Sequence, residues 1–240
     1  MTNLRTLHFY ATPEHECSYL ENKTAKTLFV DPQAEISQET YSQLSDLGFR
    51  RSGKHIYRPH CDDCQACISV RVPIALFQPS KSQKRIINKN KDITITRHSP
   101  SFTQEYYALY SRYINERHRD GDMFPPSFEQ FNSFLVEGQE HTYFFEFRNA
   151  EGELLAVSVV DYLPKGLSAI YTFFDPSQEK RSLGSFCVLW QLQKCQKENL
   201  NYLYLGYWVR QCRKMNYKIS FRPIEFLIDG YWTLIQQPTS

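Results

Sequence analysis

The sequence predicts an α+β protein, with a C-terminal mixed sheet flanked by helices and a smaller N-terminal α/β part. Two observations lead to this fold class. Strands and helices interleave after residue 101, which is typical of a mixed sheet covered by helices. Before residue 97 the expected elements are short and separated by turns, so we expect a division into residues 1–100 and 101–240.

Composition restricts the class of protein. The chain has 240 residues, of which 15% are aromatic and 22% are charged, the balance of a globular protein with a sizeable core. The net charge of +2 gives no overall field for nucleic acid, so such a partner would need a local basic patch. No apolar run is as long as a membrane span and no signal-peptide core is visible, so we expect a cytoplasmic protein without membrane contact.

Short elements are expected in the first hundred residues. Residues 36–47 have a helical pattern that ends before Gly48, a residue type suited to the position after a helix. The other expected elements are strands at 6–12 and 27–30, a hairpin over 49–60 turning at Ser52-Gly53, a strand at 68–74, a basic helix at 80–92 and a strand at 93–98.

Longer elements are expected in the second part. Residues 101–118 repeat aromatic and leucine side chains at helical spacing, and a second helix begins at Ser127. Strands are predicted at 141–147, 154–163, 167–176 and 202–208, with a long helix after Arg181.

The connection between the strand at 167–176 and the following helix suggests a ligand site. Free amides at a helix N-terminus, with the helix dipole behind them, attract anions, and Gly184 would let the backbone approach a ligand closely. Arg181 and Ser182 lie in the same loop. Acyltransferases of the GNAT type hold the pyrophosphate of coenzyme A at such a step. An ordinary connection whose glycine eases a turn is the alternative.

A basic run covers residues 81–91 and contains no acid. On a helix, Lys81, Lys84 and Arg85 would lie close together, where they could neutralise phosphates or clamp a carboxylate. A solvated helix face is the alternative, but the concentration of charge favours an anionic partner.

A series of stretches resembles one known family in matching order, from about residue 7 to about residue 230. They include FYATPEHECSYL, LFVDP, LGFRRSG, YRPHCDDCQACISVRVP, FQPSKSQKR, YINERHRDGDM, SAIYTFFDP, RSLGSF, YLYLGYWV and KMNYK. The sequence is therefore similar to the arginyl-tRNA–protein transferase family, in particular its bacterial aspartate/glutamate leucyltransferases.

The resemblance implies an enzyme of the N-degron pathway. Its partners would be leucyl-tRNA, which supplies leucine, and proteins that begin with Asp or Glu, whose α-amino group receives it. The resemblance also implies an N-terminal part and a GNAT-like C-terminal part, which agrees with the division expected near residue 100. The chemistry requires a neutral amine to attack an activated ester, so positioning and oxyanion stabilisation should contribute most of the catalysis.

Several residues are candidates for these tasks. Asp175 could accept or relay a proton, and the hydroxyl of Tyr171 or Tyr207 could donate to the oxyanion or to the leaving ribose oxygen. Turn formation and core packing would explain the same residues without catalysis. The candidates for substrate binding are Arg181, Ser182 and Gly184, which would face the tRNA 3′ end, and Arg71, Lys84 and Arg85, which would offer cations to the acidic N-terminal residue or to tRNA.

Three cysteines, Cys61, Cys64 and Cys67, follow one another at regular spacing. A ferredoxin-type cluster would continue with a fourth Cys at position 71, where this chain has an arginine, so only a distant residue such as Cys17 could complete a zinc or iron–sulfur site. The alternative, which we favour, is free thiols packed as small hydrophobic groups. The transfer itself requires no cofactor.

Other functions fit parts of the same pattern. An arginyl-tRNA–protein transferase or a GNAT acetyltransferase that uses acetyl-coenzyme A would share the fold. A zinc-dependent RNA-binding module without catalysis would explain the cysteines and the basic run, but not the large aromatic C-terminal part.

Overall fold

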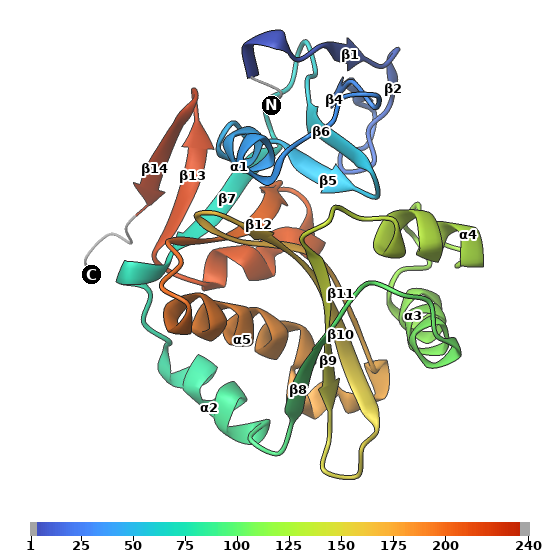
Figure 1. Ribbon diagram of the computed structural model, residues 1–240, viewed down its shortest axis with the longest axis vertical. Helices are drawn as coiled ribbons and strands as arrows, with labels where there is room; N and C mark the ends of the chain where they lie inside the picture. The colour runs from blue at the N-terminus through green and yellow to red at the C-terminus, as the bar shows by residue number, and fades with distance from the viewer. Residues whose placement is uncertain (1–3, 236–240) are drawn as a thin grey trace.

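The structure is a computed structural model that describes residues 4–235, which form one large sheet and two small ones (Figure 1). The large mixed sheet has eight strands in the order β14-β13-β7-β12-β11-β10-β9-β8. These are β7 (Ile68–Pro73), β8 (Thr94–His98), β9 (Thr142–Arg148), β10 (Leu154–Leu163), β11 (Gly166–Phe174), β12 (Tyr202–Trp208), β13 (Ile224–Ile228) and β14 (Tyr231–Ile235). This arrangement, with helices on both faces, confirms the predicted fold class.

The two small sheets are N-terminal. A four-stranded antiparallel sheet has the order β1-β4-β6-β5, and β2 pairs with β3. Their strands are β1 (Phe9–Ala11), β2 (His15–Glu16), β3 (Thr24–Ala25), β4 (Thr27–Val30), β5 (Arg50–Ser52) and β6 (His55–Pro59). The hairpin predicted over 49–60 is therefore confirmed as β5 and β6.

Helices cover both faces of the large sheet (Figure 1). They are α1 (Gln38–Asp46), α2 (Lys81–Lys89), α3 (Gln104–Arg117), α4 (Phe128–Phe131), which continues as a π-helical turn (Asn132–Val136), and α5 (Leu183–Lys197). Ser80 is the N-cap of α2 and forms a reciprocal capping box with Gln83. Thr103 and Ser127 are the N-caps of α3 and α4, and each side chain accepts a hydrogen bond from a backbone N–H of the first turn. Local sequence therefore fixes where these helices start.

The expected division at residue 100 does not separate the sheets. Strand β7 lies in the middle of the large sheet between β13 and β12, and β8 forms its edge beside β9. Both strands precede residue 100, because the chain crosses from the N-terminal sheet into the large one. Strands β13 and β14 were not predicted, although the Asp229-Gly230 turn that joins them is a local hairpin signal.

The core has one apolar cluster on each face of the large sheet and a third under α1. On one face α5 packs against the strands through residues such as Leu192, and on the other face α3 and α4 pack through aromatic residues such as Tyr110 and Phe131. The third cluster joins α1 to the large sheet, with Leu44 and Leu163 among its buried members. The N-terminal part is therefore packed directly onto the sheet that follows it in sequence.

A buried ion pair connects the two parts. Arg51 of β5 donates to both carboxylate oxygens of Asp161 of β10, at 2.7 and 2.8 Å, and the two side chains are 0% and 1% exposed. Tyr41 of α1 and Thr142 of β9 donate to the same carboxylate at 2.9 and 2.7 Å. Three separate elements thus share one acceptor in the interior.

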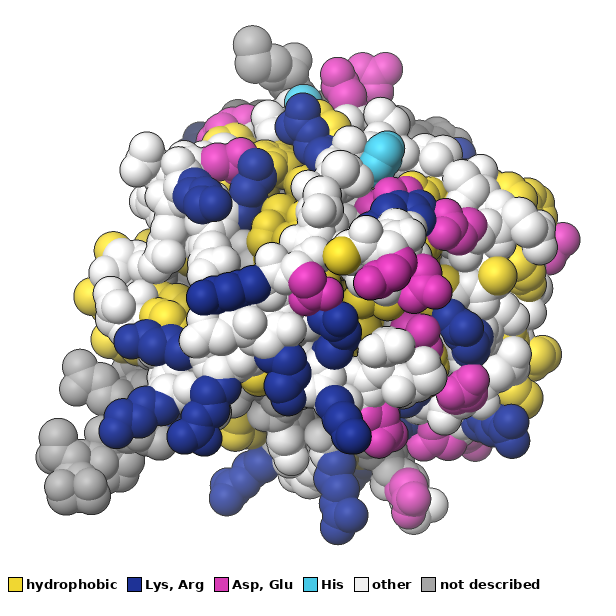
Figure 2. Space-filling model, turned by 90° about the horizontal axis from the view of Figure 1, so that it is seen from below, with side chains coloured by type: hydrophobic (Ala, Val, Ile, Leu, Met, Phe, Trp, Pro, Cys, Tyr) yellow, Lys and Arg dark blue, Asp and Glu magenta, His cyan; other side chains and the backbone are white. Residues whose placement is uncertain are grey.

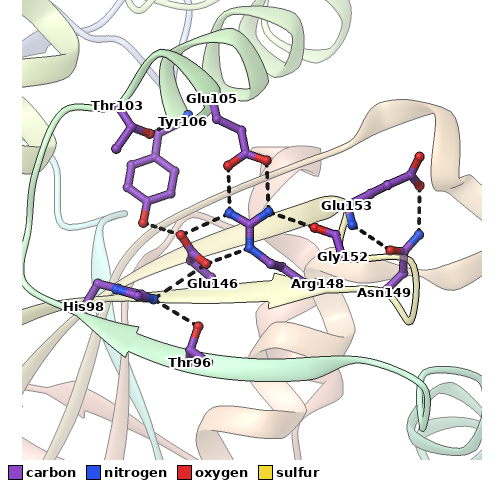
Figure 3. A network of polar contacts seen from close by, with 10 residues as sticks. All are labelled: Thr96, His98, Thr103, Glu105, Tyr106, Glu146, Arg148, Asn149, Gly152 and Glu153. Carbon is purple, nitrogen blue, oxygen red and sulfur yellow. Dashed lines mark hydrogen bonds and ion pairs between the residues drawn. The ribbon is translucent and has the colours of Figure 1, made fainter.

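A second polar network holds α3 against the edge of the sheet (Figure 3). Arg148 of β9 donates to Glu105 at 2.9 and 2.7 Å and to Glu146 at 2.8 Å, while Tyr106 donates to Glu146 at 2.5 Å. Burial alone would raise the pKa of Glu146, but the hydrogen bonds from Arg148 and Tyr106 outweigh it and lower that pKa. The network fixes the first turn of α3 and so the direction of the whole helix.

Replacing Asp161 with Ala should destabilise the protein strongly, because it leaves a buried guanidinium without its partner. We expect the free energy of unfolding, measured by urea denaturation, to fall by about 3–5 kcal/mol. Asp120→Ala is the matched control, because it breaks an exposed ion pair with Lys214 and should leave stability unchanged. Equal effects of the two substitutions would contradict this role of Asp161.

Candidate functional site

The candidate site lies where the parallel strands β11 and β12 separate. They pair only over Gly166–Ser168 and Tyr202–Tyr204, although β11 continues to Phe174 and β12 to Trp208. An irregularity in the ladder between β12 and β7 lies at the same level of the sheet. Beyond Ser168 the backbone groups on these facing edges have no partner strand, and side chains from elsewhere in the chain occupy this position.

Arg50 is the first of these side chains. It belongs to β5 of the N-terminal sheet, is 8% exposed, and donates to Ser168 Oγ at 2.9 Å and to the carbonyl of Ala169 at 2.6 Å. It lies over Gly206, where a Cβ would be 3.2 Å from Arg50 Nε, and where φ is +79°. A glycine is therefore required at position 206 both by the backbone conformation and by the space that Arg50 fills.

Lys218 is the second side chain. It lies in the 3₁₀ segment Arg213–Ser220 (η5), is 9% exposed, and donates from Nζ to the carbonyl of Tyr207 at 2.5 Å. Burial, followed by the positive charge of Arg50, lowers the pKa of Lys218 to about 7. Two cations are thus buried near each other at the point where the strands part.

Tyrosine side chains surround the two cations. The hydroxyl of Tyr207 donates to the carbonyls of Gly48 and Tyr57, at 2.8 and 3.2 Å, so it is engaged by the backbone. Tyr217 is 47% exposed. Burial of its hydroxyl raises the pKa of Tyr217, and the positive charge of Arg50 opposes that rise.

Tyr171 offers a hydroxyl on the same side. It is half-buried in β11, its ring packs against Tyr113 and Phe134, and its hydroxyl has no hydrogen-bond partner within residues 4–235. Burial, with smaller contributions from Tyr113 and other neighbouring tyrosines, raises its pKa, so the group is neutral and can donate a hydrogen bond.

Asp175 lies at the end of β11. One carboxylate oxygen accepts from the backbone N–H of Ser177 at 3.0 Å and from its hydroxyl at 2.8 Å, and the other lies 3.6 Å from Arg112. The side chain thus caps the 3₁₀ turn Pro176–Arg181 (η4), as expected for an aspartate before proline.

Comparison with known proteins places the chain in a family. The models of the arginine-tRNA-protein transferase N terminus and C terminus match residues 15–85 and 105–228. The chain belongs to the arginine-tRNA–protein transferase family. Among its relatives, a protein of Marinobacter nauticus is 55% identical over 97% of this chain and 98% of its own, and one of Hahella chejuensis is 54% identical over 98% and 100%. Both are named aspartate/glutamate leucyltransferase.

Solved structures are similar only at a distance. L-PGS from Bacillus licheniformis gives a TM-score of 0.46 with 15% identity, over 60% of this chain and 47% of its own. FemX gives a TM-score of 0.44 with 9% identity, over 86% and 81% of the two chains.

Arg71, expected to offer a cation to a substrate of the family, has a structural role instead. It donates to Asp46 at 2.9 Å and to Glu225 at 2.6 Å, and its guanidinium lies 3.6 Å from the ring centre of Tyr202 and 4.1 Å from that of Trp232. Because two carboxylates and two aromatic faces surround it, Arg71 is neutralised within the fold and joins α1, β7 and β13.

The loop before α5 is tied to the segment that follows α2. Arg181 donates to both oxygens of Asp92 at 2.9 and 2.8 Å, and its carbonyl accepts from Asn90 at 2.9 Å. Ser182 is left-handed (φ 53°) and does not cap α5 with its side chain, and a Cβ on Gly184 would lie 3.0 Å from the ring of Phe174. The glycine thus makes room for a phenylalanine, and an anion at this helix end stays a prediction.

The predicted basic helix is confirmed as α2. Lys84 and Arg85 are exposed, and the surface seen from below, on the side of α2, carries many Lys and Arg side chains (Figure 2). Ile86 and Ile87 anchor the helix to the core beside α5. Gln83 of α2 donates to the carbonyl of Ser220 at 3.0 Å, so the helix also contacts the end of the segment that carries Lys218.

The cysteines do not form a metal site in the part of the chain that the structure describes. Residues 4–235 contain no group of three or more His, Cys, Asp or Glu side chains that could hold a metal ion. Cys17, Cys61, Cys64 and Cys67 are half-buried free thiols, and burial, with the three other thiols nearby, raises the pKa of Cys67 to about 12. The zinc or iron–sulfur site considered for them does not fit this arrangement. No helix in residues 4–235 has the length and apolar character needed to cross a bilayer.

Sequence reasoning missed Arg50 and Lys218. Both lie in stretches that resemble the family, LGFRRSG and KMNYK, but neither stretch shows which cations are buried. The sequence could not show that the two residues lie near each other, because Arg50 belongs to the N-terminal sheet and Lys218 to a segment after β12.

The lowered pKa of Lys218 predicts a pH-dependent cost of burial. Between pH 7 and the ordinary lysine pKa of 10.5, the unfolded chain binds a proton that the folded chain does not, so this residue makes stability rise with pH. Lys218 should therefore raise the free energy of unfolding by about 2–3 kcal/mol between pH 7 and pH 9. The measurement is urea unfolding of Lys218→Met and of the unsubstituted protein at pH 7 and pH 9. The free energy of unfolding of the variant, relative to that of the unsubstituted protein, should be higher at pH 7 than at pH 9. The same difference at both pH values would contradict the buried, lowered-pKa lysine.

Proposed function

We propose that the protein transfers leucine from leucyl-tRNA to the α-amino group of proteins that begin with Asp or Glu, which marks them for degradation. The single observation that supports this most is full-length similarity. Relatives named aspartate/glutamate leucyltransferase align over 97% or more of this chain at 52–55% identity.

The chemistry needs few groups. A free α-amino group has a pKa of about 8, so near neutral pH a fraction is already the neutral nucleophile. It attacks the carbonyl carbon of the aminoacyl ester, an amide bond forms, and the ester bond to the tRNA ribose breaks. Tyr171, whose neutral hydroxyl is unpaired within the described residues, is our candidate donor to the oxyanion or to the leaving ribose oxygen.

Tyr207 and Asp175 have more indirect roles in this proposal. The hydroxyl of Tyr207 holds Gly48 and Tyr57 next to Arg50, and Asp175 orders the turn after β11. We therefore propose that both position the site and that neither exchanges a proton with substrate.

The exposed cations of α2 are the proposed contact for the tRNA backbone. Phosphates are held by surface Lys and Arg side chains that need no burial, and α2 carries four of them and no acidic residue. The surface around α2 is rich in the same charge (Figure 2).

A transfer assay tests the function directly. Labelled leucyl-tRNA is incubated with peptides that differ only in their first residue: Asp, Glu, Arg or Ala. We expect label on the Asp and Glu peptides alone. Label from arginyl-tRNA but not from leucyl-tRNA would identify an arginyl transferase instead, and no label from either would overturn the transferase proposal.

Replacing both Lys84 and Arg85 with Ala should weaken leucyl-tRNA binding. The plot of log affinity against log salt concentration should become less steep by about one to two, because each lost phosphate contact removes roughly one unit of slope. The matched control replaces Lys23 and Lys54, two exposed lysines of the N-terminal part, and should keep the original slope. Equal slopes for all three proteins would exclude α2 from the tRNA contact.

A further inference from the structure

Four basic side chains are buried among residues 4–235, and they fall into two kinds. Arg51 and Arg71 are paired with carboxylates of the chain. Arg50 and Lys218 have no carboxylate partner within residues 4–235, and their hydrogen bonds go to neutral acceptors, the Ser168 hydroxyl and backbone carbonyls. A buried charge without a counter-ion is costly, so such a pair is expected to serve a ligand.

The geometry supports a small anionic group as the ligand. Arg50 lies over Gly206 and Lys218 donates to the carbonyl of the next residue, Tyr207, so a single anion could neutralise both. The backbone edges around them are open because β11 and β12 no longer pair beyond Ser168. Tyr217, which adjoins Lys218 in sequence, is 47% exposed, so the pair lies next to the surface along the chain.

We propose that Arg50 and Lys218 bind the side-chain carboxylate of the acceptor protein's N-terminal Asp or Glu. This inference rests on the proposed function, because it assigns the acidic specificity of that reaction to two residues. The carboxylate replaces the missing counter-ion and places the adjoining α-amino group beside the tyrosines of the site.

The position of the pair favours a carboxylate over tRNA phosphate. Side chains that are less than 10% exposed cannot follow a nucleic-acid backbone, whereas one carboxylate at the start of a peptide can enter. Exposed cations for the tRNA are already present on α2, among them Lys84 and Arg85. The remaining candidate, Arg71, is neutralised by Asp46 and Glu225.

Tyr217 links this pocket to the proposed reacting centre. Arg50 acts on the pKa of Tyr217, and Tyr217 in turn is one of the groups that raise the pKa of Tyr171. Arg50, Tyr217 and Tyr171 are therefore within electrostatic reach of one another, as a site that holds a side chain and presents its α-amine requires.

The test compares two peptides that differ only in Asp or Asn at the first position. Asn keeps the shape and removes the charge. The variant Lys218→Gln keeps a hydrogen-bond donor for the Tyr207 carbonyl, and Lys214→Gln, on the exposed face of the same segment η5, is the matched control. Transfer from saturating leucyl-tRNA gives kcat/KM for each peptide, and a filter assay gives the leucyl-tRNA affinity.

We expect Lys218→Gln to lower kcat/KM for the Asp peptide on the order of 100-fold. The Asn peptide, the leucyl-tRNA affinity and all values for Lys214→Gln should stay unchanged. An unchanged preference for Asp over Asn would overturn the inference while the transferase function stands. An equal loss with both peptides together with weaker leucyl-tRNA binding would also overturn it, and would assign the pocket to a tRNA phosphate.

A binding arm keeps the inference independent of catalysis. If the unsubstituted protein labels no peptide, the proposed function fails. Calorimetric titration of the Asp and Asn peptides without tRNA then still shows whether Arg50 and Lys218 bind the carboxylate. Tighter binding of the Asp peptide that Lys218→Gln abolishes would support it, and equal binding of both would reject it. Arg50→Gln should behave as Lys218→Gln does, and melting curves establish that each variant is folded.

Discussion

The carboxylate of Asp161 is the constraint on which the arrangement of the two parts depends. A charge in the interior has to be neutralised by nearby groups, and here they come from β5, α1 and β9. Strand β10 is therefore tied to the N-terminal sheet by this carboxylate. Since Arg50 precedes Arg51 in the same short strand, the ion pair that fixes Arg51 also fixes Arg50 where β11 and β12 separate.

The site is thus composite in sequence and continuous in space. The large sheet supplies the open edges and Tyr171, the N-terminal sheet supplies Arg50, and the segment after β12 supplies Lys218. The insertion of β7 between β12 and β13 makes this possible, because it carries the chain from the small sheet into the middle of the large one. The large sheet takes strands from both sides of residue 100.

Local signals in the sequence were reliable where they describe short-range physics. The caps at Ser80, Thr103 and Ser127, the left-handed Gly48 after α1 and the apolar periodicity of α3 each act within a few residues. They predicted where elements begin and end. They did not predict β13 and β14, whose place depends on pairing with β7 across a long stretch of chain.

The sequence by itself determined the fold class, most helices and strands, and the family, because nearly the whole length carries the resemblance. Only the tertiary structure decided which charges are available to a ligand. Arg50 and Arg51 are identical neighbours in sequence, yet one is neutralised by Asp161 and the other has no carboxylate partner in residues 4–235. The physical reason is that the free energy of a buried charge depends on its partners, and these partners come from strands more than a hundred residues away.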